Sequence, residues 1–341
     1  MTDENLADGH LIDEWLTYME SSKGRTVRTI ETYRTGLKML CDFMQGKPLV
    51  EADGAELETF CGLWLHRKGK IASGRRPYIS AVRGFYAWLL SKKLVRGNAA
   101  GQLEHPITGK PLPRVLSLAN AEKLMWAPDM STFIGIRDAT MLSVLIGCGL
   151  RVSGLTNLNE GDLQTVEIDH QPRLTIRAIE KGQRERIVPV PREAEMLLRV
   201  YLGHEDLAKI DRGVKGHTGY PDKVLFVSVR STVLAAHEHI GEQRRLTRKA
   251  VRDVIQRYGK RLDIPAAELH PHAMRHLFGT ELQEEDTPTL GIQELLGHRD
   301  PKSTAVYAQL AIRKKMATVD KAAPLGKMRT PVSELLKRLP R

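Results

Sequence analysis

The stretch QELLGHRDPKSTAVYAQL, residues 293–310, carries one tyrosine, Tyr307, nine residues after a Gly-His pair at Gly297 and His298. An aromatic side chain in a helix-like segment usually belongs to a hydrophobic core. A phenol can also act as a nucleophile, and a nearby histidine suits that chemistry. The residues that come before this stretch decide between the two interpretations.

A second stretch, HPHAMRHLFGTEL at 270–282, places His272 three residues before Arg275, so that one helix face presents both side chains. His272 and His276 are four residues apart, a spacing that can hold zinc. No third ligand lies between them, and Arg275 on the same face would repel a dication. We therefore expect no metal and no cofactor, and we interpret His276 as a structural histidine that donates to a backbone carbonyl.

Two earlier segments add cations. Arg151 lies in GCGLRVSGLTNLNEGDL, at the end of a nearly all-apolar segment, 136–150, that predicts a buried helix ending at a glycine turn. The alternation of apolar and polar residues over 173–190 predicts a β-hairpin with Lys181 at its turn. Taken alone, each of these cations would be interpreted as an ordinary surface residue.

The ordered set resembles the tyrosine recombinase (phage integrase) superfamily, including its Xer-like members. The segment around Arg151 is similar to the family's first-arginine motif, residues 270–282 to its His-x-x-Arg motif, and residues 293–310 to its Leu-Gly-His and tyrosine motif. The resemblance spans nearly the whole chain, and the last two motifs are specific together. It implies the catalytic residues Arg151, Lys181, His272, Arg275, His298 and Tyr307.

The resemblance also implies their roles. Tyr307 would attack a DNA phosphodiester and form a covalent 3′-phosphotyrosine, which conserves the bond energy for resealing. The planar guanidinium groups of Arg151 and Arg275 match phosphate oxygens, and His298 adds a donor. Lys181 is the candidate acid for the 5′-hydroxyl leaving group. His272 is left to position the phosphate or to accept the tyrosine proton.

One position departs from the family pattern. Many members carry an acidic residue three positions after the first arginine, where this chain has Gly154. That carboxylate helps to hold the arginine, so its absence leaves open how Arg151 is anchored. Glu160 and Asp162 are possible substitutes, and we expect Gln309, in place of the usual histidine, to matter little.

We expect a mainly α fold with a small antiparallel β-sheet. Helical patterns near 10–20, at 29–44, near 55–66 and at 77–95 predict a four-helix domain, with Thr29 near the start of one helix and Pro77 in the first turn of another. With the resemblance, residues 1–105 form a helical core-binding (DNA clamp) domain and 106–117 a linker. Residues 118–312 form the catalytic domain, and 313–341 a basic tail.

Composition supports this interpretation. The chain has 341 residues, a net charge of +11 and a pI of about 9.5, with basic clusters spread along its length, which favours a polyanionic partner. No apolar run approaches the ~18–20 residues that span a bilayer, and the acidic, polar start does not resemble a signal peptide. The three cysteines form no CxxC pair. We expect a cytoplasmic, nucleoid-associated protein without a membrane partner.

The resemblance implies a site-specific recombinase or integrase that acts as a homotetramer on two double-stranded DNA sites through a Holliday junction. By analogy with the family, the tail would dock on a neighbouring protomer, with an amphipathic pattern at 330–339. Two alternatives stay open. One is a type IB topoisomerase or telomere-resolvase-like enzyme with the same chemistry, and the other is a DNA-binding architectural protein that has lost catalysis.

Overall fold

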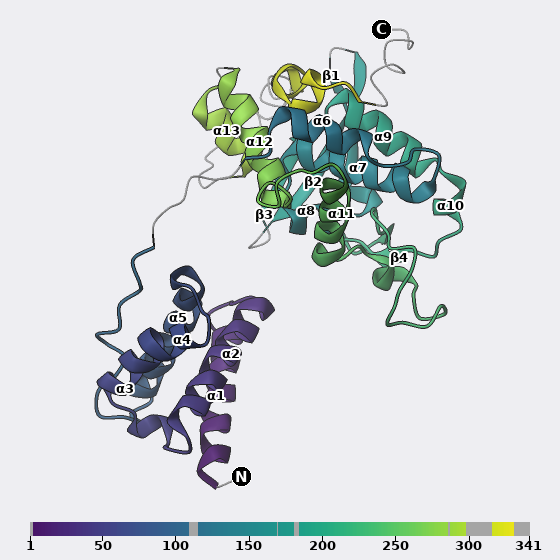
Figure 1. Ribbon diagram of the computed structural model, residues 1–341. Coiled ribbons are helices and arrows are strands. Elements are labelled where there is room, and N and C mark those ends of the chain that lie inside the picture. Colours follow the sequence, from purple (N-terminus) through teal and green to yellow (C-terminus); the bar gives the residue numbers. More distant parts are fainter. Residues whose placement is uncertain are drawn as a thin grey trace. The chain divides into compact units, whose positions relative to one another are not determined.

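The computed structural model describes residues 3–108, 115–168, 170–180, 184–285, 287–297 and 316–330 (Figure 1). The chain divides into two compact units, Met1–Pro111 and Leu112–Arg341. Lys181, His298 and Tyr307 lie outside the described residues. Within the described residues, no helix is both long enough and apolar enough to cross a bilayer.

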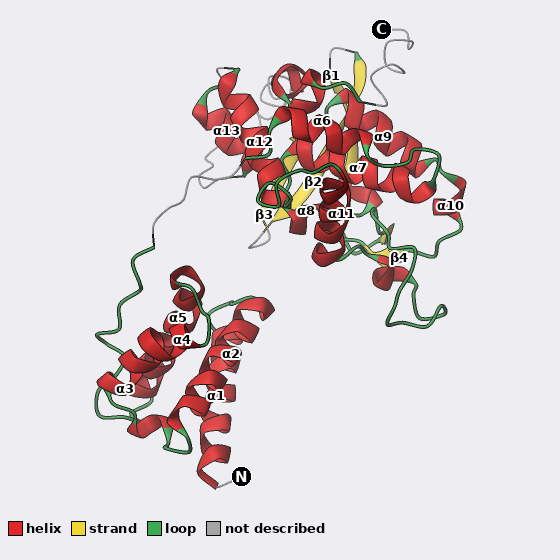
Figure 2. Ribbon diagram, viewed as in Figure 1, coloured by secondary structure: helices red, strands yellow, loops and turns green. Residues whose placement is uncertain are grey.

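The first unit consists of helices joined by loops, with no strand among its described residues (Figure 2). Its α-helices are α1 (Asp3–Ser21), α2 (Val27–Met44), α3 (Gly54–Thr59), α4 (Leu65–Arg67) and α5 (Ala72–Ser91). A π-helical turn, Phe60–Trp64, joins α3 to α4, so these two form one continuous helical segment. The four helical segments predicted from the sequence are therefore confirmed. Their buried faces meet in one core built around aromatic side chains, among them Trp15, Phe60 and Phe85.

Two helix starts differ from the sequence prediction. The cap of α2 is Thr26, whose hydroxyl accepts from the backbone N–H of Thr29, so Thr29 itself lies inside the first turn. Helix α5 begins at Ala72, which places Pro77 inside the helix and not in its first turn. The five residues before Pro77 all adopt the helix, although a proline removes its own N–H donor from the ladder and its ring crowds the carbonyl four residues earlier.

The second unit combines helices with two small sheets. Its helices are α6 (Leu118–Trp126), α7 (Phe133–Cys148), α8 (Val152–Thr156), α9 (Arg192–Leu202), α10 (Glu205–Ala208), α11 (Arg248–Arg261), α12 (Pro271–Glu284), α13 (Thr289–Leu296), a helical segment at 316–322, and α15 (Pro324–Lys327). The sequence prediction of a mainly α fold with small antiparallel sheets is confirmed.

Helix α7 forms the centre of this unit. All of its residues except Ile134 are buried, and it packs against α6, α9, α12 and α15 (Figure 1). The Thr132 hydroxyl caps its start by accepting from the Gly135 N–H at 3.0 Å. A buried ion pair lies inside the helix, because the Asp138 carboxylate accepts from the Arg137 guanidinium at 2.6 Å. The sequence predicted a buried helix over 136–150, and the structure confirms it with an earlier start.

The predicted hairpin is confirmed as strands β2 (Gln171–Glu180) and β3 (Arg184–Pro189), which pair antiparallel with Glu180 opposite Arg184. A further strand, β1 (Leu163–Ile168), adds to the other side of β2 and was missed, because its apolar pattern is weak. The short strands β4 (Gly213–Lys215) and β5 (Pro221–Lys223) form a second antiparallel pair, which was not predicted from the sequence.

Residues 316–330, which the sequence assigned to a tail, pack on the second unit itself. Arg173 forms a bidentate ion pair with Asp320, with both N–O distances 2.7 Å. Val319, Ala322 and Ala323 are buried against α12 and α13 in a small core. The end of the described chain is therefore anchored on the unit that carries the candidate site.

Candidate active site

Arg151 lies directly after the turn that ends α7. Gly149 closes the helix in the left-handed conformation, with φ of 58°. A Cβ at that position would also lie 2.4 Å from the Phe278 ring, so both the backbone and the packing require glycine. Arg151 then occupies the N-cap position of α8 and is partly buried, which lowers its pKa.

Arg275 lies in the second turn of α12 and is 6 % exposed. Its Nη1 donates to the Gly149 carbonyl at 2.6 Å, and its Nη2 donates to the Leu296 carbonyl. One guanidinium therefore connects three segments that are far apart in sequence: the turn before Arg151, α12 itself, and the end of α13. Burial, with Arg151 and Arg186 adding, lowers the pKa of Arg275 to about 9.

The start of α12 is fixed by His270 and Pro271. The His270 Nδ1 accepts from the backbone N–H of Ala273 at 3.0 Å, and Pro271 occupies the first helical position, where its missing N–H costs nothing. Sequence reasoning missed His270 as a cap, although a polar residue directly before a proline was the available signal.

His272 follows in the first turn of α12, with a solvent-exposed side chain. Partial desolvation lowers its pKa below the ordinary histidine value, and His270, Arg275, His276 and Arg151 shift it in the same direction. The lowered pKa favours the neutral imidazole, which is able to accept a proton. His276, interpreted from the sequence as a structural histidine, is exposed.

Arg186 is a third arginine near Arg151 and Arg275. It lies on β3 opposite Ala178, and its Nη1 donates to the carbonyl of Leu295 in the last turn of α13. Burial lowers its pKa to about 10, Arg151 acts in the same direction, and Cys148 opposes the shift. Nothing in its sequence context distinguishes this residue from the many other basic side chains.

We call Arg151, Arg186 and Arg275 the arginine cluster. Their side chains concentrate positive charge in a partly buried region of the second unit. Burial is the first cause of the lowered pKa at all three, and mutual repulsion adds to it at Arg186 and Arg275. An anion would relieve that repulsion, and guanidinium groups match phosphate oxygens in shape and charge. The structure brings Arg151, His272 and Arg275 together, whereas Lys181, His298 and Tyr307 lie outside the described residues.

The two carboxylates considered as anchors for Arg151 are engaged elsewhere. Glu160 pairs with Arg212 at 2.5 Å, and Asp162 pairs with Arg177 at 3.0 Å. Neither is therefore available as the substitute that the sequence suggested. At Gly154 a Cβ would meet no atom within 4 Å, so packing does not enforce the loss of the family's side chain.

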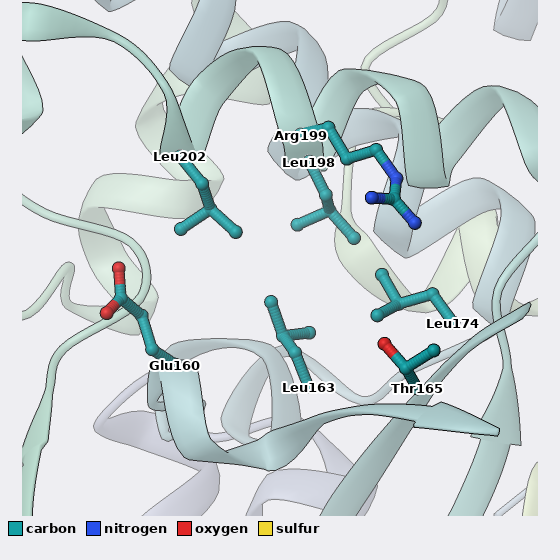
Figure 3. Close-up of a pocket in the computed structure, with 7 residues that line it drawn as sticks. All are labelled: Glu160, Leu163, Thr165, Leu174, Leu198, Arg199 and Leu202. Atoms are coloured by element: carbon teal, nitrogen blue, oxygen red, sulfur yellow. The ribbon is translucent and has the colours of Figure 1, made fainter. Parts of the chain in front are cut away.

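A separate pocket lies between α9 and the sheet formed by β1, β2 and β3. Leucine side chains from β1, β2 and α9 line it, with Glu160, Thr165 and Arg199 at its edges (Figure 3). It contains none of the arginine cluster, and two of its charged groups are paired, Glu160 with Arg212 and Arg199 with Glu195. This pocket does not contribute to the candidate site.

Comparison with known proteins decides the family. Residues 114–313 match the model of the Phage integrase family, and residues 12–93 match the Phage integrase N-terminal SAM-like domain. The chain belongs to the phage integrase family. The resemblance seen in its motifs is thereby confirmed, and each of the two matched domains lies within one unit of the structure.

Curated relatives of this integrase include tyrosine recombinases. Tyrosine recombinase XerD of Pseudomonas aeruginosa is 33 % identical over 304 residues, which cover 88 % of this chain and 93 % of the relative. Tyrosine recombinase XerC of Xylella fastidiosa is 29 % identical over 317 residues, covering 92 % and 97 %. These matches identify the integrase as a tyrosine-type site-specific recombinase.

Solved structures share the fold. The XerH site-specific recombinase in a post-cleavage complex with its palindromic difH substrate gives a TM-score of 0.63 at 17 % identity, covering 88 % of this chain and 83 % of the other. A lambda integrase dimer bound to a COC′ core site gives 0.61 at 14 % identity, covering 90 % and 77 %.

Proposed function

We propose that this recombinase cuts and rejoins duplex DNA at specific sites through a covalent 3′-phosphotyrosine at Tyr307, and exchanges strands through a Holliday junction. The observation that carries the proposal is the arginine cluster. Arg151 and Arg275, from two distant segments of the chain, converge with a third guanidinium under partial desolvation. The motif order in the sequence supplies the remaining residues.

The cluster suits the transition state of this reaction. Attack on a phosphodiester creates a pentacoordinate phosphorus whose oxygens carry extra negative charge. Preorganised donors aimed at that charge are worth about 3 kcal/mol each in other enzymes. Arg151 and Arg275 would bind the non-bridging oxygens, with His298 as a third donor. Because the fold holds these cations in place, the chain's own residues are able to stabilise the negative charge of the transition state.

The bond changes balance without water or ATP. The phenolic oxygen of Tyr307 bonds to phosphorus, the bond from phosphorus to the 5′ oxygen breaks, and the segment upstream of the break stays on the enzyme through its 3′ phosphate, while the downstream segment leaves with a 5′-hydroxyl. Lys181 donates a proton to the leaving 5′ oxygen, while the neutral His272 accepts the tyrosine proton or positions the phosphate. The reverse of these steps rejoins a strand, so that resealing needs no further energy source.

The direct test is covalent trapping followed by peptide mapping. Duplexes are selected by the protein itself from a randomised pool and nicked at successive positions, so that a short 5′-hydroxyl strand diffuses away after cleavage. We expect an adduct that survives denaturation, with the DNA attached to the peptide that contains Tyr307. Attachment elsewhere, or through a 5′ phosphate, would contradict the proposal.

The same preparation separates the alternatives. Recombinant products from two paired sites support strand exchange, whereas relaxation of supercoiled DNA without exchange would indicate a topoisomerase-like enzyme. Reversible binding without any adduct would indicate an architectural protein. Each outcome has a distinct electrophoretic signature, so one set of substrates decides among the three.

We further propose that the enzyme acts as a homotetramer on two sites and that residues 331–341 contribute to assembly. Residues 327–330 are part of the packed second unit. Lys327 pairs with Glu281 at 2.9 Å, and the Trp126 indole donates to the Arg329 carbonyl. Met328 and Thr330 are also buried. A truncation that tests assembly therefore has to retain Thr330.

Truncation after Thr330 is expected to abolish assembly on paired sites while leaving single-site affinity within about threefold, because the contacts of 316–330 remain. Sedimentation of protein–DNA complexes with one and two sites measures both. Truncation after Gly326 is the comparison, and we expect it to lower the melting temperature as well, since it removes the Lys327 ion pairs. Unchanged pairing of sites after the first truncation would refute a role for the tail.

A further inference from the structure

The end of α13 is held from two sides by arginines. Arg186 donates to the carbonyl of Leu295, and Arg275 donates to the carbonyl of Leu296, so that consecutive carbonyls of the last turn each accept from a guanidinium. The last carbonyls of a helix have no partner within it, and side chains commonly satisfy them. Here the donors come from two other elements of the unit, β3 and α12.

These two contacts differ in what they connect. Arg275 is itself a phosphate-binding candidate, so its contact is part of the proposed site. Arg186 lies on β3, in a strand whose six residues all pair with β2, and β2 pairs in turn with β1. Its contact therefore ties a short helix to a three-stranded sheet.

The position of this contact along the chain matters for the site. Gly297 follows the helix with φ of 65°, and its N–H donates to the Glu294 carbonyl at 3.1 Å. The chain turns sharply there, and the next residue is His298. A change in the last turn of α13 would therefore be transmitted to His298 through a single residue.

We propose that Arg186 is a positioning residue for His298: it holds the carboxyl end of α13 against the sheet and so sets where that histidine meets the phosphate. The inference rests on the role of His298 in the proposed function. Arg186 needs no contact with DNA to act in this way. Misplacement of a reacting group by about 1 Å can cost about a hundredfold in rate.

The test is a double-mutant cycle on the rate of adduct formation in a single turnover. In the otherwise unchanged protein, Arg186→Gln is expected to lower the rate by about ten- to a hundredfold with DNA affinity nearly unchanged. In a His298→Ala background the same change is expected to lower it by less than about threefold, because the group it positions is already gone. In a Lys181→Ala background the full loss is expected to persist.

Two variants guard against a general loss of structure. Arg177→Gln is the matched control, because Arg177 lies on the same sheet, is partly buried, and pairs with Asp162 at 3.0 Å without a part in the proposed chemistry. It is expected to leave the cleavage rate unchanged. Arg186→Lys keeps one charged donor and is expected to recover part of the rate, and it replaces Arg186→Gln in the cycle should the glutamine variant not fold.

The outcomes distinguish the inference from the proposed function. Equal losses in all three backgrounds would show that Arg186 does not act through His298 and would overturn the inference alone. A His298→Ala protein that cleaves at the normal rate would refute the role of that histidine, and the inference would fall with it. Coupling to Lys181 in place of His298 would also overturn the inference, because it would place the effect on the hairpin and not on α13.

Discussion

Replacing Tyr307 with phenylalanine is expected to abolish adduct formation, with a loss of at least about four orders of magnitude in the cleavage rate. The change removes one oxygen atom and leaves the ring, so it deletes the nucleophile without opening a cavity. No other group in the proposed mechanism bonds to phosphorus, and a loss of this size follows when a covalent step loses its only attacking atom.

The affinity for DNA is expected to stay within about fivefold, since the net contribution of one hydrogen bond is about 1 kcal/mol. Trapping on nicked duplexes measures the chemistry, and fluorescence anisotropy on uncut duplexes measures the affinity. Tyr220→Phe is the matched control, because Tyr220 is 75 % exposed in the same unit and has no part in the proposed chemistry. An adduct that persists in the Tyr307→Phe protein would assign the nucleophile to another residue.

Local structure was predictable where a residue's role depends on its neighbours in sequence. The Ser117 hydroxyl caps α6, accepting from the Asn120 N–H at 3.2 Å, and the predicted glycine turn after α7 is present at Gly149. Caps and turns involve residues a few positions apart, so their chemistry can be read directly. The hairpin was predictable for the same reason, from alternation on both sides of a turn.

The family residues were predictable from their order and spacing, because each motif keeps its flanking residues. Arg186 and His270 were not, for two different reasons. His270 caps the start of α12, a role that histidine seldom has, so its residue type did not indicate a cap. Arg186 acts on a backbone carbonyl 109 residues away, and a carbonyl has no signature in sequence. The anchors suggested for Arg151 were wrong for a related reason, because Glu160 and Asp162 are nearby in sequence but pair with distant arginines.

Replacing Arg275 tests the arginine cluster as a whole. Both Arg275→Met and Arg275→Lys are expected to lower the cleavage rate by about a hundred- to a thousandfold, the cost of losing one well-placed donor. Lysine is not expected to substitute. Its compact ammonium group cannot reach the carbonyls of Gly149 and Leu296 and also bind a phosphate, whereas a guanidinium carries five donors in a planar fork.

A structural cost is expected beside the kinetic one. Both carbonyls lose a donor in the methionine variant, and an unsatisfied buried group costs about 1–3 kcal/mol, which thermal unfolding will register as a lower melting temperature. Arg212→Lys is the matched control, because Arg212 is also 6 % exposed and also donates to a backbone carbonyl, that of Val224 at 2.8 Å. It is expected to lose stability but not cleavage.

The stabilisation of the folded protein by a bound anion distinguishes the kinetic cost of replacing Arg275 from the structural cost. Burial and like charges disfavour the protonated cluster, so an anion that binds there should stabilise the folded protein. Inorganic phosphate at constant ionic strength is expected to raise the melting temperature of the unchanged protein and of Arg212→Lys, and to raise that of Arg275→Met much less. Equal increases in all three proteins would show that phosphate does not bind the cluster, and the low cleavage rate of Arg275→Met would then reflect only the displaced turn at Gly149 and the loosened end of α13.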